Sequence, residues 1–117
     1  MHIRENKTGE VTIIAINEHL DAATATVFEE KLLGLIDGGE RRVIVDCEGL
    51  EYVNSAGLKV FLLAAKRLEL VGGKLVLCAL APNVMMIFEM IGFTRIMKIC
   101  RTRDEALREI AGLTATA

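Results

Sequence analysis

Short, nearly continuous apolar runs alternate along the chain with longer segments whose apolar residues recur at helical spacing. The runs at residues 11–16, 43–45 and 75–78 are rich in valine, isoleucine and leucine. They predict strands that are buried on both faces, as in a parallel sheet. A shorter strand is expected at residues 3–5, paired with the run at 11–16 in a hairpin whose turn is formed by residues 6–10.

Four segments carry apolar stripes at helical spacing and predict helices. Asp21 is a good N-cap for the first helix, because its carboxylate can accept hydrogen bonds from backbone N–H groups of the first turn. Pro82 is typical of a first helical position, and the paired glycines of the chain are typical helix ends. The expected helices lie between Asp21 and Gly38, between Ser55 and Gly72, between Pro82 and Gly92, and over residues 103–110.

This order of elements predicts an α/β domain with a mostly parallel, buried sheet, an N-terminal edge hairpin and about four helices. A last short strand is expected at residues 96–99, and residues 19–21 and 48–53 are expected to be connectors outside the sheet. We expect one domain over residues 1–111 and a disordered tail over residues 112–117.

Composition and charge narrow the function classes. The chain has 117 residues, and its 14 basic and 16 acidic residues give a net charge of −2, without the basic excess of a nucleic-acid-binding protein. The longest apolar run, residues 75–81, is far shorter than the roughly 18 residues of a membrane-spanning helix. The first residues are polar and include Glu5, so no secretory signal is expected. We therefore expect a cytoplasmic protein that binds neither nucleic acid nor membranes.

Cysteine and histidine positions argue against metal chemistry. The three cysteines form no Cys-x-x-Cys pair, and their odd number fits a reducing compartment. Cys47 and Cys78 lie within apolar runs and are expected to be buried. His2 and His19 have no metal-ligand neighbours at helical or hairpin spacing, so we expect neither a metal site nor a cofactor.

Ser55 lies where a strand connector meets a helix start, and sites in α/β sheets gather at such places. From spacing alone, its hydroxyl is an N-cap, a nucleophile or a phosphoacceptor. A hydrolase elbow requires Gly-x-Ser-x-Gly, but the segment here is Val53-Asn54-Ser55-Ala56-Gly57, and both histidines precede the serine. Catalysis by Ser55 is therefore disfavoured, and we expect a protein that is not an enzyme.

Residues 52–58, Tyr-Val-Asn-Ser-Ala-Gly-Leu, following the strand that ends at Asp46, resemble the signature of STAS domains, the anti-sigma factor antagonist family. Flanking segments resemble the family in the same order along nearly the whole chain. They are residues 20–24, 72–77, 91–93 and 104–107. The resemblance implies a bacterial regulatory switch without enzymatic activity of its own. In that family the unphosphorylated domain binds an anti-sigma factor, a histidine-kinase-like ATPase, and so releases a sigma factor.

The resemblance assigns phosphorylation to Ser55, with the anti-sigma factor as the serine kinase and a metal-dependent serine phosphatase as the enzyme that reverses it. Asn54 stands where the family usually has aspartate, and Ala56 stands where a second serine is common. The asparagine removes a negative charge beside the acceptor hydroxyl. It therefore leaves open an alternative, a STAS scaffold or sensor module that does not switch and binds a protein or a small ligand.

A partner surface is expected beside Ser55. Val60 and Leu63 fall outside the main apolar stripe of the second helix, and Met85 and Met86 lie on the third helix. Flexible methionines suit adaptable contacts, but all four side chains could equally cover the sheet or a neighbouring helix. The candidate partner-binding residues are Asp21, Asn54, Ser55, Ala56, Val60, Leu63, Met85 and Met86. Asp46, at a strand end, is expected to satisfy the local backbone.

Overall fold

The sheet of the protein has five strands in sequence order, as the computed structural model shows for the backbone of residues 2–115 and the side chains of residues 2–111. The first two strands pair antiparallel, and every later neighbour in the sheet is parallel. This confirms the predicted mostly parallel sheet with an N-terminal hairpin. The strands are β1 (Ile3–Thr8), β2 (Val11–Leu20), β3 (Arg42–Val53), β4 (Lys74–Cys78) and β5 (Lys98–Cys100).

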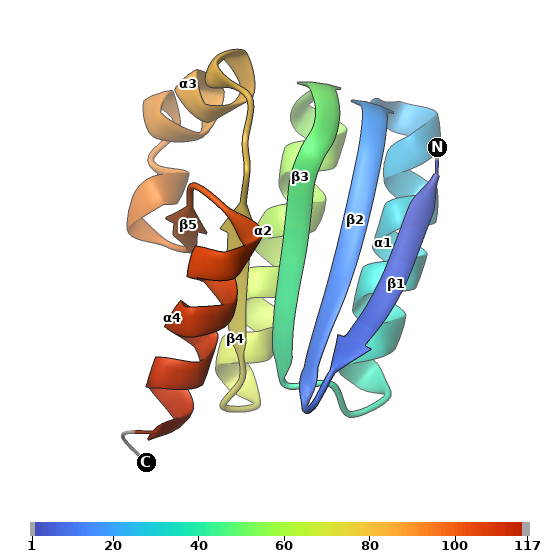
Figure 1. Ribbon diagram of the computed structural model, residues 1–117. Helices are drawn as coiled ribbons and strands as arrows, with labels where there is room; N and C mark the ends of the chain where they lie inside the picture. Colours follow the sequence, from blue (N-terminus) through green and yellow to red (C-terminus); the bar gives the residue numbers. More distant parts are fainter. Residues whose placement is uncertain (1, 116–117) are drawn as a thin grey trace.

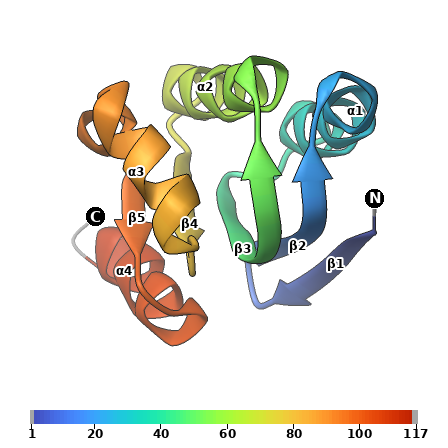
Figure 2. The ribbon, with the colours of Figure 1, turned by 90° about the horizontal axis from the view of Figure 1, so that it is seen from above.

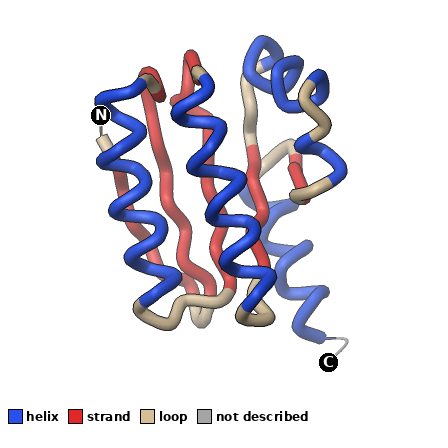
Figure 3. The backbone as a smooth tube through the Cα atoms, turned by 180° about the vertical axis from the view of Figure 1, so that it is seen from behind, coloured by secondary structure: helices blue, strands red, loops and turns tan. Residues whose placement is uncertain are grey.

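Helices cover the two faces of the sheet unequally. Two of them lie side by side across one face, and the last helix lies on the opposite face (Figures 1, 2 and 3). A third helix follows the end of β4 and leads through a 3-10 turn into β5. In chain order they are α1 (Ala22–Asp37), α2 (Ser55–Leu70), α3 (Pro82–Met90), the 3-10 turn η1 (Phe93–Arg95) and α4 (Arg103–Ala115).

The main core lies between the sheet and the helices α1 and α2. A chain of edge-to-face aromatic contacts runs through it from Phe28 to Phe61, Phe88 and Phe93, with ring centroids 5.2, 5.3 and 5.6 Å apart. A smaller core beneath α4 includes Ile44 and Cys78. Each large apolar side chain that is fully buried stabilises the fold by about 1.5–3 kcal/mol, so the two cores hold the helices on both faces of the sheet.

Both central strands are longer than predicted. His19 and Leu20 belong to β2, and residues 48–53 belong to β3, although both segments were expected to be connectors. The two strands remain paired to their last residues, Leu20 opposite Val53, through register shifts that accommodate the extra residues. The predicted connectors are wrong because parallel pairing continues through polar residues.

The C-terminal elements also differ from the prediction. Residues 96–99 were expected to form the last strand, but β5 is shifted to Lys98–Cys100, because the 3-10 turn η1 occupies the preceding segment. The last helix, expected over residues 103–110, continues through Ala115. The predicted tail therefore begins inside α4, and its last residues, 116 and 117, lie outside the described part of the chain.

The edge strand β1 is strongly polar. Its hairpin turn is tighter than expected and is formed by Gly9 and Glu10, with Gly9 at a φ of 63° that glycine adopts without strain. Glu5 on this strand forms an ion pair with Lys31 of α1, with Oε1 and Nζ 2.5 Å apart. This contact fixes the outer strand to the helix layer.

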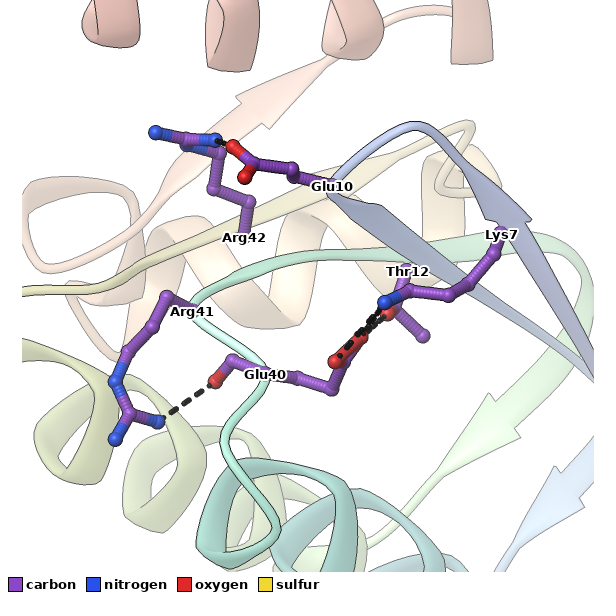
Figure 4. Close-up of polar contacts among 6 residues, drawn as sticks. All are labelled: Lys7, Glu10, Thr12, Glu40, Arg41 and Arg42. Carbon is purple, nitrogen blue, oxygen red and sulfur yellow. Dashed lines mark hydrogen bonds and ion pairs between the residues drawn. The ribbon is translucent and has the colours of Figure 1, made fainter.

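At the amino edge of the parallel strands, polar and charged side chains connect the strands with the segments that precede β2 and β3 (Figure 4). The Glu40 carboxylate accepts hydrogen bonds from the Thr12 hydroxyl and from Lys7 Nζ, whose closest approach is 2.8 Å. These bonds to Lys7 and Thr12 lower the pKa of Glu40. Arg42 and Glu10 form a second ion pair, with Nη1 and Oε2 2.5 Å apart.

The predicted burial of the cysteines is confirmed. Cys47 and Cys78 are buried, and so is Cys100. Burial raises the pKa of the Cys78 thiol to about 12 and also raises the pKa of Cys47 and Cys100. These thiols remain protonated at neutral pH, and a protonated thiol is a poor nucleophile and metal ligand.

Candidate functional site

The candidate site lies at the carboxyl edge of the sheet, where β2 and β3 end side by side. Leu20 and Val53 are register partners at their last positions. The backbone N–H of Asn54 donates to the Leu20 carbonyl at 3.0 Å, so the two strand ends are joined directly. The next residues, Asp21 and Asn54, are the N-caps of α1 and α2. Two helix starts are therefore neighbours at one edge, as expected for parallel strands.

Asn54, rather than Ser55, caps α2. Its Oδ1 accepts hydrogen bonds from the backbone N–H groups of Ala56 at 3.0 Å and Gly57 at 3.3 Å. Ser55 is the first residue of the helix, which confirms the predicted position of this serine at a helix start. The interpretation of its hydroxyl as the cap is wrong, because the Asn54 side chain already occupies that role.

Ser55 is left exposed at the first helical position. Its hydroxyl forms no hydrogen bond with any residue that the structure describes. The side chain therefore contributes to neither the cap nor the core, and its oxygen is accessible to another molecule.

Asp21 forms the equivalent cap on α1, as predicted. Its Oδ1 accepts from the N–H groups of Ala23 and Thr24, both at 3.1 Å. The Thr24 hydroxyl accepts from the Asp21 N–H at 2.9 Å, which completes a capping box, and donates to the His19 carbonyl at 2.7 Å. The hydrogen bonds from Thr24 lower the pKa of Asp21, so this side chain is ionised at neutral pH.

Gly57 lets the start of α2 lie directly on the strand ends. A Cβ atom at this position would lie 2.8 Å from Leu20 Cβ and 2.9 Å from Val53 Cγ2, distances at which atoms overlap. The position of Ser55 is therefore fixed by contact between the helix backbone and the ends of β2 and β3.

The sequence did not identify two aromatic residues beside this edge. The rings of His19 and Tyr52 meet edge to face, with centroids 5.8 Å apart and an interplanar angle of 89°. Tyr52 is 49% exposed. Their spacing from the two helix caps could have revealed this contact. His19 precedes the cap Asp21 by two residues, and Tyr52 precedes the cap Asn54 by the same number. Strand ends in parallel register bring such residues together.

Backbone distortion accompanies this ring pair. Glu18 adopts a left-handed φ of 64°, and the register of β2 against β3 shifts on both sides of it. Such a conformation is costly for a residue with a side chain and is often found at functional sites. It lies immediately before His19 and so determines where that ring is placed.

The expected partner residues on α2 and α3 separate into core and surface positions. Val60 is 1% exposed and lies in the core, where α2 meets the sheet, so the expectation of a surface position is wrong. Leu63 and Ala56 are half-buried against the same core. On α3, Met85 is half-buried and Met86 is 59% exposed.

The helix α3 is attached to the same edge. Asn83 Nδ2 donates to the Glu51 carbonyl at 3.1 Å, which links the start of α3 to the end of β3. Met86 and Met90 are both exposed, and they lie four residues apart on one side of this helix. The carboxyl edge therefore carries an exposed hydroxyl, an exposed aromatic ring and exposed methionines.

Asp46 satisfies the local backbone, as expected, and also forms a contact that the sequence did not reveal. Its Oδ1 accepts from the Glu48 N–H at 3.0 Å, and its Oδ2 lies 2.8 Å from Nη2 of Arg103, 57 residues away. Within the described residues, no three histidine, cysteine or acidic side chains are placed to hold a metal ion together. No described helix is both long and apolar enough to cross a membrane.

Comparisons with known proteins agree with this architecture. The family described as STAS domain matches residues 2–106. The protein BtrV of Bordetella bronchiseptica, named as an anti-sigma factor antagonist, is 40% identical over 106 residues, which are 91% of each chain. The crystal structure of TM1081 from Thermotoga maritima is similar, with a TM-score of 0.89 and 22% identity over 93% of this chain and 94% of the other.

A structure of SpoIIAA from Bacillus in its phosphorylated form is also similar. Its TM-score is 0.75 and its identity 23%, over 93% of this chain and 99% of SpoIIAA. These likenesses show the same fold, and the family match extends over nearly the whole chain. Together with the segment around Ser55, they confirm the resemblance seen in the sequence, and the chain belongs to the STAS domain family.

Proposed function

We propose that this protein is an anti-sigma factor antagonist whose binding to an anti-sigma factor is controlled by phosphorylation of Ser55. The observation that carries the proposal is the free, exposed hydroxyl of Ser55 at the start of α2. It is supported by the 40% identity to BtrV, which carries the name of an anti-sigma factor antagonist. Ser55 is also the only serine in the chain, so it is the one candidate for a serine kinase.

Phosphorylation of Ser55 is compatible with the fold. Asn54 already accepts the N–H groups of Ala56 and Gly57, so a phosphate on Ser55 displaces no structural hydrogen bond. Phosphoserine carries about −1.5 to −2 charges at pH 7. At a helix start those charges interact favourably with the helix dipole, by about 0.3–1 kcal/mol.

The penalty falls on the partner that covers the helix start. Two exposed side chains with apolar surface belong to the elements that meet at this edge, Tyr52 near the end of β3 and Met86 on α3. A partner docked there would have to desolvate the phosphate or meet it with a repelling group. Weakening the complex a thousandfold requires about 4 kcal/mol, a cost that an unpaired buried charge readily reaches.

The partner in this proposal is an anti-sigma factor of the histidine-kinase-like class that phosphorylates Ser55, and a serine phosphatase restores the binding form. A second candidate function is a STAS scaffold or sensor module that binds a protein or small ligand without phosphate chemistry. The observation that favours it is Asn54, because the usual aspartate beside the acceptor is absent.

The test compares the affinity of the cognate anti-sigma factor for wild type, Ser55→Ala and Ser55→Asp, measured by calorimetry. We expect the alanine variant to bind like wild type and the aspartate variant to bind at least tenfold more weakly. Thr94→Asp, which adds the same charge at an exposed position of η1, is the matched control and should bind like wild type. Equal affinities for all four proteins would contradict the switch and favour the scaffold.

A further inference from the structure

A second candidate site lies on the opposite face of the sheet, away from α1 and α2. The helix α4 covers this face near β4, whereas none of the described helices lies over it at β1 and β2 (Figure 2). A hollow of about 490 Å³ occupies the uncovered part, beside the start of α4. We call it the Ala15 hollow. Its lining includes Arg4, Ala15, Asn17, Glu48, Gly49 and Arg103.

Small residues form the floor of the Ala15 hollow. Arg4 on β1 is the register partner of Ala15 on β2, and Ala15 is the register partner of Asp46 on β3. Neighbouring strands are about 4.8 Å apart, so the backbones of Arg4 and Asp46 are separated by roughly 10 Å with one methyl group between them. Gly49 continues this floor opposite Asn17. The hollow is therefore wide enough for a small molecule between two charged walls.

One wall is a guanidinium group held in a fixed orientation. The Asp46 side chain is 6% exposed, and its Oδ2 accepts from Arg103 Nε at 2.9 Å and lies 2.8 Å from Nη2. Its Oδ1 is engaged by the Glu48 N–H. Both oxygens of the carboxylate are thus engaged, and the bonds to Oδ2 fix the guanidinium group of Arg103, which lines the hollow. A guanidinium group fixed in this way is well suited to bind a carboxylate.

Two further donors line the hollow. Arg4 has no carboxylate partner within the described residues. The Asn17 Oδ1 accepts from the backbone N–H of His2 at 3.1 Å, which leaves the Asn17 amide N–H groups free to donate. Glu48 is the lining acid that has no cationic partner among the described residues, and it is exposed. The hollow therefore offers cations and an amide to an anionic group, and one free carboxylate to a cationic group.

We propose that the Ala15 hollow binds a small zwitterion that carries a carboxylate and an ammonium group, the class to which free α-amino acids belong. The carboxylate of the ligand lies between Arg4 and Arg103, and its ammonium group faces Glu48. Among the described residues the lining has one ring, that of His2, and no tyrosine, phenylalanine or tryptophan, so it offers little stacking surface to a nucleobase and a compact ligand is the better fit.

The experiment follows backbone amide chemical shifts of the full chain during titration with alanine, acetate or ethylammonium at constant ionic strength. We expect saturable shifts at Ala15, Asn17 and Gly49 with alanine, and weaker binding of the two single-charge probes. Arg4→Gln should weaken alanine binding roughly tenfold or more, because a charge-assisted hydrogen bond is lost. Arg95→Gln, an exposed arginine on η1, is the matched control and should leave binding unchanged.

Two further variants keep the test decisive. Glu48→Gln should reduce the preference for alanine over acetate, and Ala15→Val should fill the floor and abolish binding while the strand is preserved. Shifts that do not saturate, or equal affinities in wild type and Arg4→Gln, would overturn the site. Equal affinities of the wild type for alanine and acetate would show that the ammonium group adds nothing to binding and would contradict a zwitterionic ligand. None of these measurements involves Ser55 or an anti-sigma factor, so they are independent of the proposed switch.

Discussion

The two edges of the parallel sheet are stabilised in different ways. At the amino edge, Lys7 and Glu40 join residues 33 positions apart, and Glu10 and Arg42 join residues 32 apart (Figure 4). At the carboxyl edge, the polar side chains of Asp21 and Asn54 bind backbone groups only two or three residues ahead of them. The long-range ion pairs join strands to connecting segments, whereas the local caps complete individual helices.

This difference indicates where a charge can be added to the chain without a large loss of folding stability. A charge added at the amino edge would compete with side chains that connect β1, β2 and the loop before β3. A charge added at Ser55 meets a helix start where Asn54 already binds the N–H groups of Ala56 and Gly57. The proposed phosphorylation site therefore lies at a helix start whose side-chain cap is local.

The substitution with the largest expected effect tests whether close packing of α2 on the ends of β2 and β3 stabilises the carboxyl edge. Gly57→Ala should lower the free energy of unfolding by about 1–2 kcal/mol, because overpacking costs about 1–3 kcal/mol and the better helix propensity of alanine recovers up to about 1. The new methyl group would overlap Leu20 and Val53. Urea unfolding followed by circular dichroism measures the change.

Gly34→Ala is the matched control for this substitution. Gly34 lies in the interior of α1 with open space around the Cβ position, so the same change should stabilise the protein by up to about 1 kcal/mol. Destabilisation of both variants to the same extent would contradict the close packing of α2 on the strand ends.

The second prediction compares the contributions of Asn54, the helix cap, and Ser55, the proposed phosphoacceptor, to folding stability. Asn54→Ala should cost about 1 kcal/mol, because two N–H groups of α2 lose their acceptor. Ser55→Ala should change the free energy of unfolding by less than about 0.5 kcal/mol, as is usual for exposed positions without partners. Thermal and urea unfolding of the two variants measure this difference, and an equal cost for both would show that the serine hydroxyl also caps the helix.

A third prediction concerns the charge beside the acceptor. If the proposed kinase recognises the aspartate usual in this family, Asn54→Asp should be phosphorylated several-fold faster than wild type. Charge-assisted hydrogen bonds are roughly twice as strong as neutral ones, which corresponds here to about 1 kcal/mol. The advantage should shrink as salt is added. Initial rates at low and high salt measure it, and faster phosphorylation of the asparagine form at low salt would show that repulsion of the incoming phosphate dominates.

The smallest expected effect concerns the contribution of Glu40, at the amino edge, to the pH dependence of folding stability. The bonds from Lys7 and Thr12 hold the pKa of Glu40 below its ordinary value of 4.5. The folded state therefore favours the charged carboxylate, and this stabilisation is present above pH 4.5 and is lost as the pH falls through the lowered pKa.

Glu40→Gln should accordingly make the unfolding free energy less dependent on pH below 4.5. Urea titrations at a series of acidic pH values measure the slope. Glu30→Gln, on the exposed side of α1, serves as the control. An unchanged slope in the Glu40 variant would mean that this cluster contributes little to acid stability.

The sequence predicted those elements whose signals are local. Apolar runs located the central strands, and Asp21 was recognised as a cap because aspartate before an apolar stripe has few other roles. The second half of β3 was missed because its buried residues, Leu50 and Val53, alternate with polar ones that face solvent. The extent of that strand depends on pairing with β2, which no local pattern reveals.

The start of α2 was predictable to within one residue. Asn54 and Ser55 are both good cap residues, and only the geometry of the helix start decides which one bonds the backbone. Val60 falls outside the main apolar stripe of α2, so the sequence left it between a partner surface and the core, and the structure buries it in the core. The contact of Asp46 with Arg103 joins residues 57 apart and carries no signal in the sequence.

The polar edge strand β1 has a consequence for the behaviour of the protein at high concentration. An unpaired strand edge is a template on which another molecule can extend the sheet, and flat apolar edges lead to aggregation. Here Arg4, Glu5 and Lys7 line the edge, and Glu5 and Lys7 are anchored to α1 and to Glu40. Two molecules that approach edge to edge would have to bury these charges together. The strand therefore protects the chain against polymerisation through this edge of the sheet.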